Sequence, residues 1–259
     1  MPDKPCRLVF KVYTTKYLGT ESHAAICLSI LKQLPKKFVP TKVGRDDKKN
    51  FFSLHYPENF LAMIQEENKY EGQVSLYKVR GLFYFGLSWR KLSVEELAKS
   101  PGKRYNSIFF TTNAWESCLA DESDFNALEQ IWLQFCTTFD AVYGYCSIED
   151  ATRNWVRGFG NCLPRLYWKT YFGDPYINVL KIEGTQNDLC TISKCKKGIL
   201  LEIIGDPREL IYPRNQLEDR LISALGCDYF WNNNDYSNIG NGKFQYKLPN
   251  LDLSEIILD

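Results

Sequence analysis

The pattern of hydrophobic and polar positions divides the first part of the chain into a strand followed by a helix. Residues 7–15 alternate apolar and polar side chains and are rich in β-forming types, which predicts a first strand. Residues 24–34 carry a helical pattern, and either Thr20 or Ser22 can serve as the N-cap.

The next stretch contains turn signals, β-rich runs and one helical pattern. Residues 39–50 are charged and turn-like, whereas 51–56 are expected to form a strand that stops before a proline. Residues 57–68 are expected to form a helix, with proline at its first position. The β-rich runs 73–80 and 81–90 are separated by little more than a glycine, which predicts an antiparallel hairpin.

The centre of the chain contains the clearest amphipathic helix. A short helix is expected over 93–100, because Ser93 is followed three residues later by Glu96 in the capping-box arrangement. Residues 106–112 form a predicted strand. A helix over 123–139 is predicted by apolar residues that recur on one helical face. These residues are Phe125, Leu128, Ile131, Trp132, Phe135 and Phe139.

The second half continues the mixture of strands and helices. The expected elements are a strand over 142–147, a short helix over 149–155, a buried strand over 199–204 and a helix over 215–225 ended by Gly226. Because strands and helices mix without regular βαβ alternation, we predict the α+β class. The expected architecture is a mixed, largely antiparallel sheet packed with helices, in a single compact unit of residues 1–259. A two-lobed organisation with a boundary near 110–120 is the alternative.

Composition and cysteine usage indicate an ordinary globular protein. The chain has 32 basic and 31 acidic side chains, and 44% of its residues are hydrophobic. No apolar run reaches the roughly 18 residues that a membrane helix needs. The start of the chain lacks the pattern of a secretory signal. The nine cysteines are odd in number and scattered, so we expect free thiols and a cytoplasmic location.

The sequence shows no recognisable catalytic or metal-binding motif. His23 and His55 are isolated, and the spacing of Cys190 and Cys195 matches neither a redox motif nor a zinc site. Residues 157–162 contain two glycines but do not complete a phosphate-binding pattern. We therefore expect no enzymatic activity, no metal and no cofactor, although a site assembled from dispersed residues would leave little trace in the sequence.

The charges are strongly segregated along the chain. Residues 1–110 carry 19 basic and 10 acidic side chains, a net charge of +9, and residues 151–259 carry 13 of each sign. Residues 111–150 carry eight acids and no base. Acids at a helix start stabilise the helix dipole, so a solvated helix face is one interpretation. The other is an acidic surface that docks a basic partner.

The segment 161–205 carries a resemblance to a known class of proteins. An aromatic run from Trp168 to Phe172 leads into Gly173 and Pro175, followed by a polar stretch and an apolar strand. This order resembles bacterial immunity proteins of polymorphic-toxin and type VI secretion systems, in particular families paired with restriction-endonuclease-fold nuclease toxins. The resemblance covers about the last two-thirds of the chain. It implies that Trp168, Tyr171, Phe172, Gly173 and Pro175 are fold determinants rather than toxin contacts.

The resemblance implies a non-catalytic α+β protein that binds one cognate toxin and blocks its active site or substrate path. A nuclease toxin must present a cationic surface to phosphates, and an inhibitor can occupy that surface with carboxylates. We therefore expect Glu116, Asp121, Glu122 and Asp124 to contribute to toxin binding. No direct contact with nucleic acid or membrane is expected, and a homo-oligomer remains open. The alternatives are a small-molecule-binding or regulatory module, with an aromatic pocket built from Trp155, Tyr167 and Trp168, and an enzyme with an unrecognised site.

Thiol titration tests the expected redox state. Protein prepared without air oxidation and denatured under non-reducing conditions should react at close to nine thiols, because the cysteines are odd in number and no secretory signal precedes them. A count lower by several thiols would show disulfide bonds and contradict the expectation.

Overall fold

The fold is built on a ten-stranded sheet. The computed structural model describes residues 6–45, 48–66, 70–78, 81–99, 104–150, 162–182, 188–208, 216–230 and 246–258. Its strands are β1 (Cys6–Thr14), β2 (Lys42–Arg45), β3 (Lys48–Phe51), β4 (Glu71–Lys78), β5 (Phe83–Arg90), β6 (Asn106–Thr112), β7 (Tyr143–Asp150), β8 (Lys169–Gly173), β9 (Cys190–Cys195) and β10 (Gly198–Ile203). They lie in the order β3-β2-β4-β5-β6-β1-β7-β8-β10-β9, and each neighbouring pair is antiparallel. The predicted α+β class and largely antiparallel sheet are confirmed.

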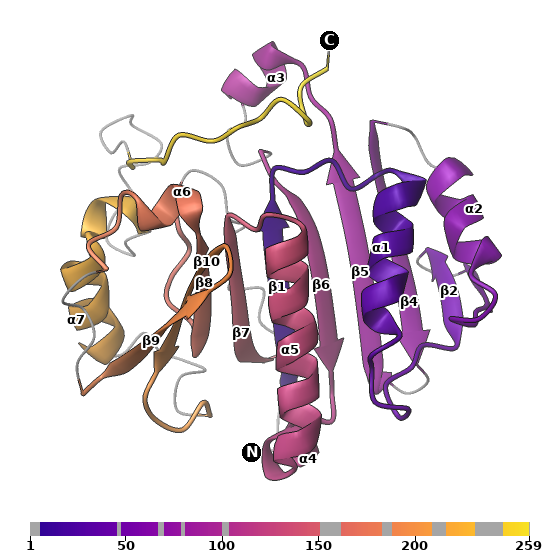
Figure 1. Ribbon diagram of the computed structural model, residues 1–259, viewed down its shortest axis with the longest axis horizontal. Helices are drawn as coiled ribbons and strands as arrows, with labels where there is room; N and C mark the ends of the chain where they lie inside the picture. Colours follow the sequence, from indigo (N-terminus) through magenta and orange to yellow (C-terminus); the bar gives the residue numbers. More distant parts are fainter. Residues whose placement is uncertain are drawn as a thin grey trace.

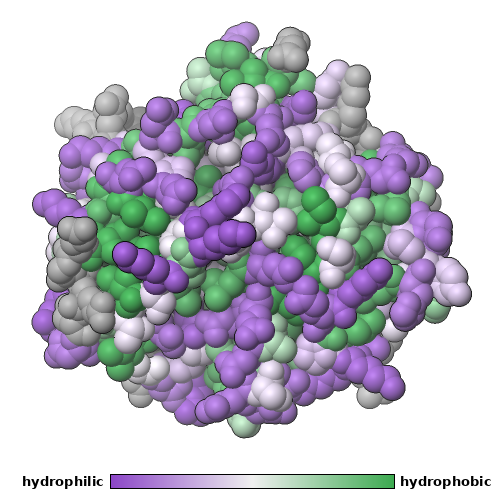
Figure 2. Space-filling view, viewed as in Figure 1, coloured by the Kyte–Doolittle hydropathy of each residue, from purple (hydrophilic) through white to green (hydrophobic). Residues whose placement is uncertain are grey.

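Helices cover the sheet. They are α1 (Glu21–Leu31), α2 (Glu58–Glu66), α3 (Val94–Lys99), α4 (Trp115–Ala120), α5 (Glu122–Thr138), α6 (Asp174–Ile177) and α7 (Gln216–Leu225), with a 3-10 turn at Cys227–Tyr229. In Figure 1, α1, α2 and α5 lie in front of the sheet. Over this face hydrophilic side chains surround smaller hydrophobic areas (Figure 2), as expected when helices bury one side. None of the helices in the described ranges is both long and apolar enough to cross a membrane.

The central strand β1 is apolar on both faces, because each face of the sheet supports its own core. Leu8, Phe10 and Val12 belong to one core, whereas Val9 and Tyr13 belong to the other. Adjacent residues of a strand point to opposite faces, so the two cores lie on opposite sides of the sheet. The first core includes buried side chains of α1, α2 and α5, and the second includes those of α6 and α7.

Helix α5 is fixed to the sheet by aromatic packing and by one buried hydrogen bond. The Phe10 ring lies 4.7 Å from Phe110, 6.2 Å from Phe125 and 6.1 Å from Trp132, measured between ring centroids. The Nε1–H group of Trp132 donates to the main-chain carbonyl of Lys11 at 3.0 Å. This bond satisfies the indole donor inside the core and sets the position of the helix along β1.

The last described segment, 246–258, runs across one end of the fold. Figure 1 shows it passing from α6 towards α3. The Leu92 amide donates to the Ile256 carbonyl at 2.9 Å, and the Leu258 amide donates to the Leu92 carbonyl at 2.9 Å. Lys16 pairs with Glu255 at 2.7 Å. The segment therefore ties the end of the chain to the connections that follow β1 and β5.

Several local predictions are confirmed. Thr20 is the N-cap of α1 and accepts a hydrogen bond from the His23 amide at 3.1 Å. Ser93 and Glu96 form the expected capping box, with the Ser93 amide 2.9 Å from the Glu96 carboxylate. Gly226 has φ 121°, a conformation that favours glycine, directly after α7.

The prediction for residues 39–56 was wrong. The turn-like stretch forms strands β2 and β3, whereas residues 51–56 contribute the end of β3 and then only a bridge between Ser53 and Tyr56. The β2–β3 hairpin lies at one edge of the sheet. Edge strands of natural sheets are commonly rich in charged residues, because charge discourages further strand pairing. The charged residues of this stretch are therefore compatible with an edge strand as well as with a loop.

Three other expectations also require correction. Strand β9 lies in the polar stretch that carried no assignment, and helix α4 precedes α5 where no helix was expected. The helix expected over 149–155 begins inside β7, which runs to Asp150, and residues 151–155 lie outside the described ranges. Of the two-glycine stretch 157–162, residues 157–161 also lie outside them.

Replacement of a core aromatic tests the packing of α5 on β1. Phe10→Ala should lower the free energy of unfolding by about 3–5 kcal/mol, because it leaves a cavity among Phe110, Phe125 and Trp132. Urea unfolding followed by circular dichroism measures the change. Phe51→Ala is the matched control, because Phe51 is 74% exposed and its loss should cost less than about 0.5 kcal/mol. Equal losses in the two variants would contradict this description of the core.

Candidate functional site

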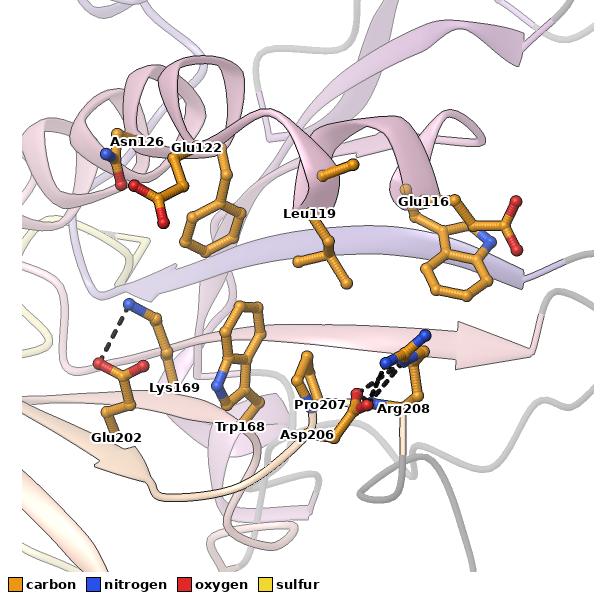
Figure 3. A pocket seen from close by; sticks show the side chains of 13 residues that line it. Glu116, Leu119, Glu122, Asn126, Trp168, Lys169, Glu202, Asp206, Pro207 and Arg208 are labelled. Carbon is orange, nitrogen blue, oxygen red and sulfur yellow. Dashed lines mark hydrogen bonds and ion pairs between the residues drawn. The ribbon is translucent and has the colours of Figure 1, made fainter.

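A groove with a volume of about 880 Å³ lies between helices α4 and α5 and the ends of strands β8 and β10. In Figure 3, Glu116, Leu119, Glu122 and Asn126 project from the helices, which we call the helix wall. Trp168, Lys169, Glu202, Asp206, Pro207 and Arg208 face them from β8, β10 and the segment after β10, which we call the strand wall. The remaining lining residues are Trp115, Ala120 and Phe125.

The helix wall carries two exposed carboxylates of the predicted set. Glu116 lies in the first turn of α4 and Glu122 in the first turn of α5. A carboxylate at a helix N-terminus interacts favourably with the helix dipole. Neither carboxylate forms a hydrogen bond or an ion pair with any residue that the structure describes. They are therefore available to a partner.

The other two predicted residues, Asp121 and Asp124, have contacts within the fold. Asp121 is exposed and caps α5 by accepting hydrogen bonds from the Ser123 amide at 3.0 Å and hydroxyl at 2.6 Å, and the hydroxyl bond holds its pKa below the ordinary value. Asp124 is 6% exposed and forms an ion pair with Lys37. The structure thus brings Glu116 and Glu122 to the groove and gives Asp121 and Asp124 structural partners.

The floor of the groove is aromatic. The rings of Phe125 and Trp168 lie 5.0 Å apart, and each residue is 8% exposed. Leu119 is directed into the same space in Figure 3. Because both rings are already largely buried, they fix the shape of the groove and leave only a small apolar surface open to a ligand.

Lys169 is a buried cation at the edge of this floor. Its Nζ atom lies 2.6 Å from the Glu129 carboxylate and 3.1 Å from that of Glu202, and only 8% of its side chain is exposed. It also lies over the rings of Phe125 and Trp168, at 5.2 and 5.3 Å from their centroids. Burial acts to lower the pKa of Lys169, but the bonds and charges of Glu129 and Glu202 outweigh it and raise the pKa. Lys169 therefore stays charged.

Arg208 makes a second ion pair on the strand wall, with Asp206. The Nε atom of Arg208 lies 2.8 Å from each carboxylate oxygen of Asp206, whose pKa is lowered chiefly by this hydrogen bond. The groove is lined by four carboxylates and two cations, and both cations belong to the strand wall. The strand wall is thus largely neutralised, whereas the helix wall keeps its negative charge.

The sequence prediction missed the strand wall. Lys169 follows Trp168 in an aromatic run, and Glu202 lies in an apolar strand, so each is a charged residue in a segment that otherwise predicts burial. Such a charge usually has a partner. This signal was present, but the partner Glu129 lies on a different element and cannot be identified from spacing.

Other predicted chemistry has structural explanations. The nine cysteines are thiols outside disulfide bonds, as predicted, and burial raises the pKa of the Cys27, Cys136 and Cys146 thiols. The Nδ1 atom of His23 lies 2.7 Å from the Tyr17 carbonyl, and His55 is exposed. In the described ranges, no group of three or more His, Cys, Asp or Glu side chains has a geometry that could hold a metal ion.

The aromatic pocket predicted from Trp155, Tyr167 and Trp168 does not form in the described residues. Trp168 belongs to the first core, but Tyr167 is 4% exposed in the second core and stacks on Tyr145 at 3.8 Å. The two side chains therefore lie on opposite faces of the sheet. Trp155 lies outside the described residues.

The residues behind the resemblance act in the fold. Tyr171 and Phe172 are fully buried in different cores, and a Cβ atom at Gly173 would collide with the carbonyl of Ala141. Pro175 lies in the first turn of α6, where its fixed φ suits a helix start. Trp168 is the exception, because it also lines the groove.

Comparisons with known proteins show a shared fold. No family model and no curated protein matches the chain. The fold is similar to that of a solved structure, the Pseudomonas aeruginosa T6SS protein PA0821, with a TM-score of 0.55 and 11% sequence identity. The match covers 96% of this chain and 88% of that chain. At this identity the likeness is one of architecture.

Removal of the buried cation tests the architecture of the strand wall. Lys169→Met should lower the free energy of unfolding by roughly 3 kcal/mol at neutral pH, because it leaves Glu129 and Glu202 without their counter-charge. The loss should shrink as the pH rises through the folded pKa of Lys169, where the wild type also loses this positive charge. In the wild type, the raised pKa of Lys169 means that this stabilisation is present below the ordinary lysine pKa of 10.5 and is lost as pH rises through the folded value.

Two variants control this measurement, which is made by urea unfolding across pH. Lys194→Met removes an exposed lysine and should have little effect. Lys169→Met combined with Glu129→Gln should recover part of the loss, because one uncompensated charge is removed. A loss in Lys169→Met that does not change with pH would argue against the buried ion cluster.

Proposed function

We propose that this chain is an immunity-type inhibitor that binds a secreted protein toxin, most plausibly a nuclease, and blocks its active site or substrate path. The observation that carries the proposal is the unpaired acidic helix wall above an aromatic floor. A surface of this composition suits a basic protein partner, since complementary charge speeds association and selects the partner.

Nuclease toxins provide such a partner. An enzyme that cleaves nucleic acid needs a cationic surface for the phosphates, and carboxylates from an inhibitor can occupy the same positions. In this proposal the carboxylates of Glu116 and Glu122 occupy the phosphate positions on the toxin directly. Asp121 and Asp124 contribute by capping α5 and by fixing it to Lys37, so their effect on binding passes through the position of the helix.

Two further considerations support the proposal. The fold is similar to that of a protein named for the type VI secretion system. The resemblance of segment 161–205 points to immunity proteins of the same systems. The charged groups that line the groove either pair with each other or have no partner among the described residues. None of these lining residues is a nucleophile placed beside a base, which is compatible with a non-catalytic inhibitor.

Charge reversal on the helix wall tests the proposal. The protein encoded beside this chain in its genome is expressed in a bacterial host, alone and with this chain, and we expect it to be toxic alone and neutralised by the wild type. The variant Glu116→Lys with Glu122→Lys should slow association of the purified proteins by about 10-fold or more at low salt, since steering depends on charge. It should also weaken protection. The wild-type association rate should fall as salt rises.

The matched control is Glu58→Lys with Glu66→Lys on α2. It changes the net charge by the same amount, and Glu58 also lies in the first turn of its helix. This control should associate and protect nearly as well as the wild type. If both double variants protect fully, the groove is not the docking surface. If the neighbouring protein is not toxic, or is not neutralised by the wild type, the proposed function fails.

A further inference from the structure

The groove contains two indole N–H groups with no acceptor in the described part of the chain. Trp115 and Trp168 both line the groove, and neither Nε1–H donates a hydrogen bond to a described residue. The Trp132 indole shows the contrast, because its N–H donates to the Lys11 carbonyl inside the core. Tyrosine and tryptophan polar groups usually find a partner when they are largely buried. Trp168 as a residue is 8% exposed, but its Nε1 atom is not among the buried polar atoms that lack a partner, so this N–H reaches solvent and is open to an acceptor from a bound protein.

Carboxylates face the same space from both walls. Glu122 on the helix wall is unpaired, and Glu202 on the strand wall is 36% exposed while it shares Lys169 with Glu129 (Figure 3). At the other end Glu116 lies across from Asp206, which is held by Arg208. A cation that enters between the walls thus meets an unpaired carboxylate on one side and a partly neutralised one on the other.

We propose that the groove accepts an arginine-bearing segment of the protein partner, with a guanidinium group against Glu122 or Glu116 and with main-chain carbonyls accepting from the Trp115 and Trp168 indoles. This inference rests on the proposed function, since it names the chemistry of the segment that docks. The partner is a protein, because a nucleic acid would bring its phosphates against the acidic helix wall.

The geometry favours arginine over lysine. A guanidinium group is planar, binds a carboxylate through two hydrogen bonds and stacks on aromatic rings, whereas an ammonium group is a strongly hydrated point charge. The edge of the floor already holds an ammonium group, because Lys169 lies over Phe125 and Trp168. A ligand cation of either kind is repelled close to Lys169, so it is expected at the open side of the groove against the helix wall, where the two-bond geometry of a guanidinium suits a carboxylate.

The test uses the full chain and three short probes: acetylated, amidated peptides of four arginines, four lysines and four glutamates. Binding is followed through the indole signals of the six tryptophans in NMR spectra at low salt. We expect the arginine peptide to shift the Trp115 and Trp168 signals and to bind about 10-fold more tightly than the lysine peptide. The glutamate peptide should not bind.

Variants locate the site. Glu116→Gln with Glu122→Gln should weaken binding of the arginine peptide by about 10-fold or more, because the unpaired carboxylates are lost. Glu58→Gln with Glu66→Gln removes the same charge from α2 and should leave binding unchanged. Trp115→Leu should reduce the preference for arginine over lysine, because it removes an aromatic surface and a donor. Equal binding of both basic peptides, or an equal loss in the two glutamine variants, would overturn the inference.

A competition experiment separates this inference from the proposed function. If the toxin binds the wild type, the arginine peptide should displace it and the Glu116→Gln, Glu122→Gln variant should bind it more weakly. If neither the arginine peptide nor the double glutamine variant changes toxin binding, the arginine site is overturned while the inhibitor function stays intact. Peptide binding at the groove without any neutralisation of the neighbouring toxin would leave the arginine site intact and refute the inhibitor function.

Discussion

The packing of α5 on the doubly buried strand β1 is the constraint on which the rest of the structure depends. Phe10 contacts Phe110, Phe125 and Trp132, and the Trp132 indole is tied to the β1 backbone. Because α4 and α5 are consecutive, the position of α5 determines where both carboxylates of the helix wall lie. The strand wall is joined to β1 through β7 and β8 in the same sheet, so the two sides of the groove share one rigid support.

The electrostatics of the groove follow from how far each charge lies from solvent. Lys169 is buried, and it is tolerated because Glu129 and Glu202 surround it. The first turns of α4 and α5 reach solvent, so Glu116 and Glu122 need no internal counter-charge. The result is a surface on which carboxylates and indole donors have no partner among the described residues and face solvent. Such a surface offers most to a partner that brings cations and carbonyl groups, as an exposed basic segment of a protein does.

The acidic segment 111–150 shows how one sequence feature divides into separate roles. Its excess of negative charge is plain in the sequence, and the structural interpretation applies to two of its acids, whereas docking stays a proposal for two others. Asp121 caps a helix and Asp124 pairs with Lys37, as a structural role requires, whereas Glu116 and Glu122 face the groove. Spacing along the chain did not separate them, because burial of Asp124 depends on where the loop that carries Lys37 meets α5.

Local patterns in the sequence specify the α+β class, most helices and strands, the capping box of Ser93 and Glu96 and the acidic character of residues 111–150. These features depend on local periodicity and on short-range hydrogen bonds, which neighbouring residues specify. The strand order, the edge hairpin β2–β3, the strands β8 and β9 and the pairing of Lys169 with Glu129 depend instead on contacts between distant segments. The groove also belongs to this second group, because its walls come from segments more than 40 residues apart along the chain, and only packing against a common sheet brings them together.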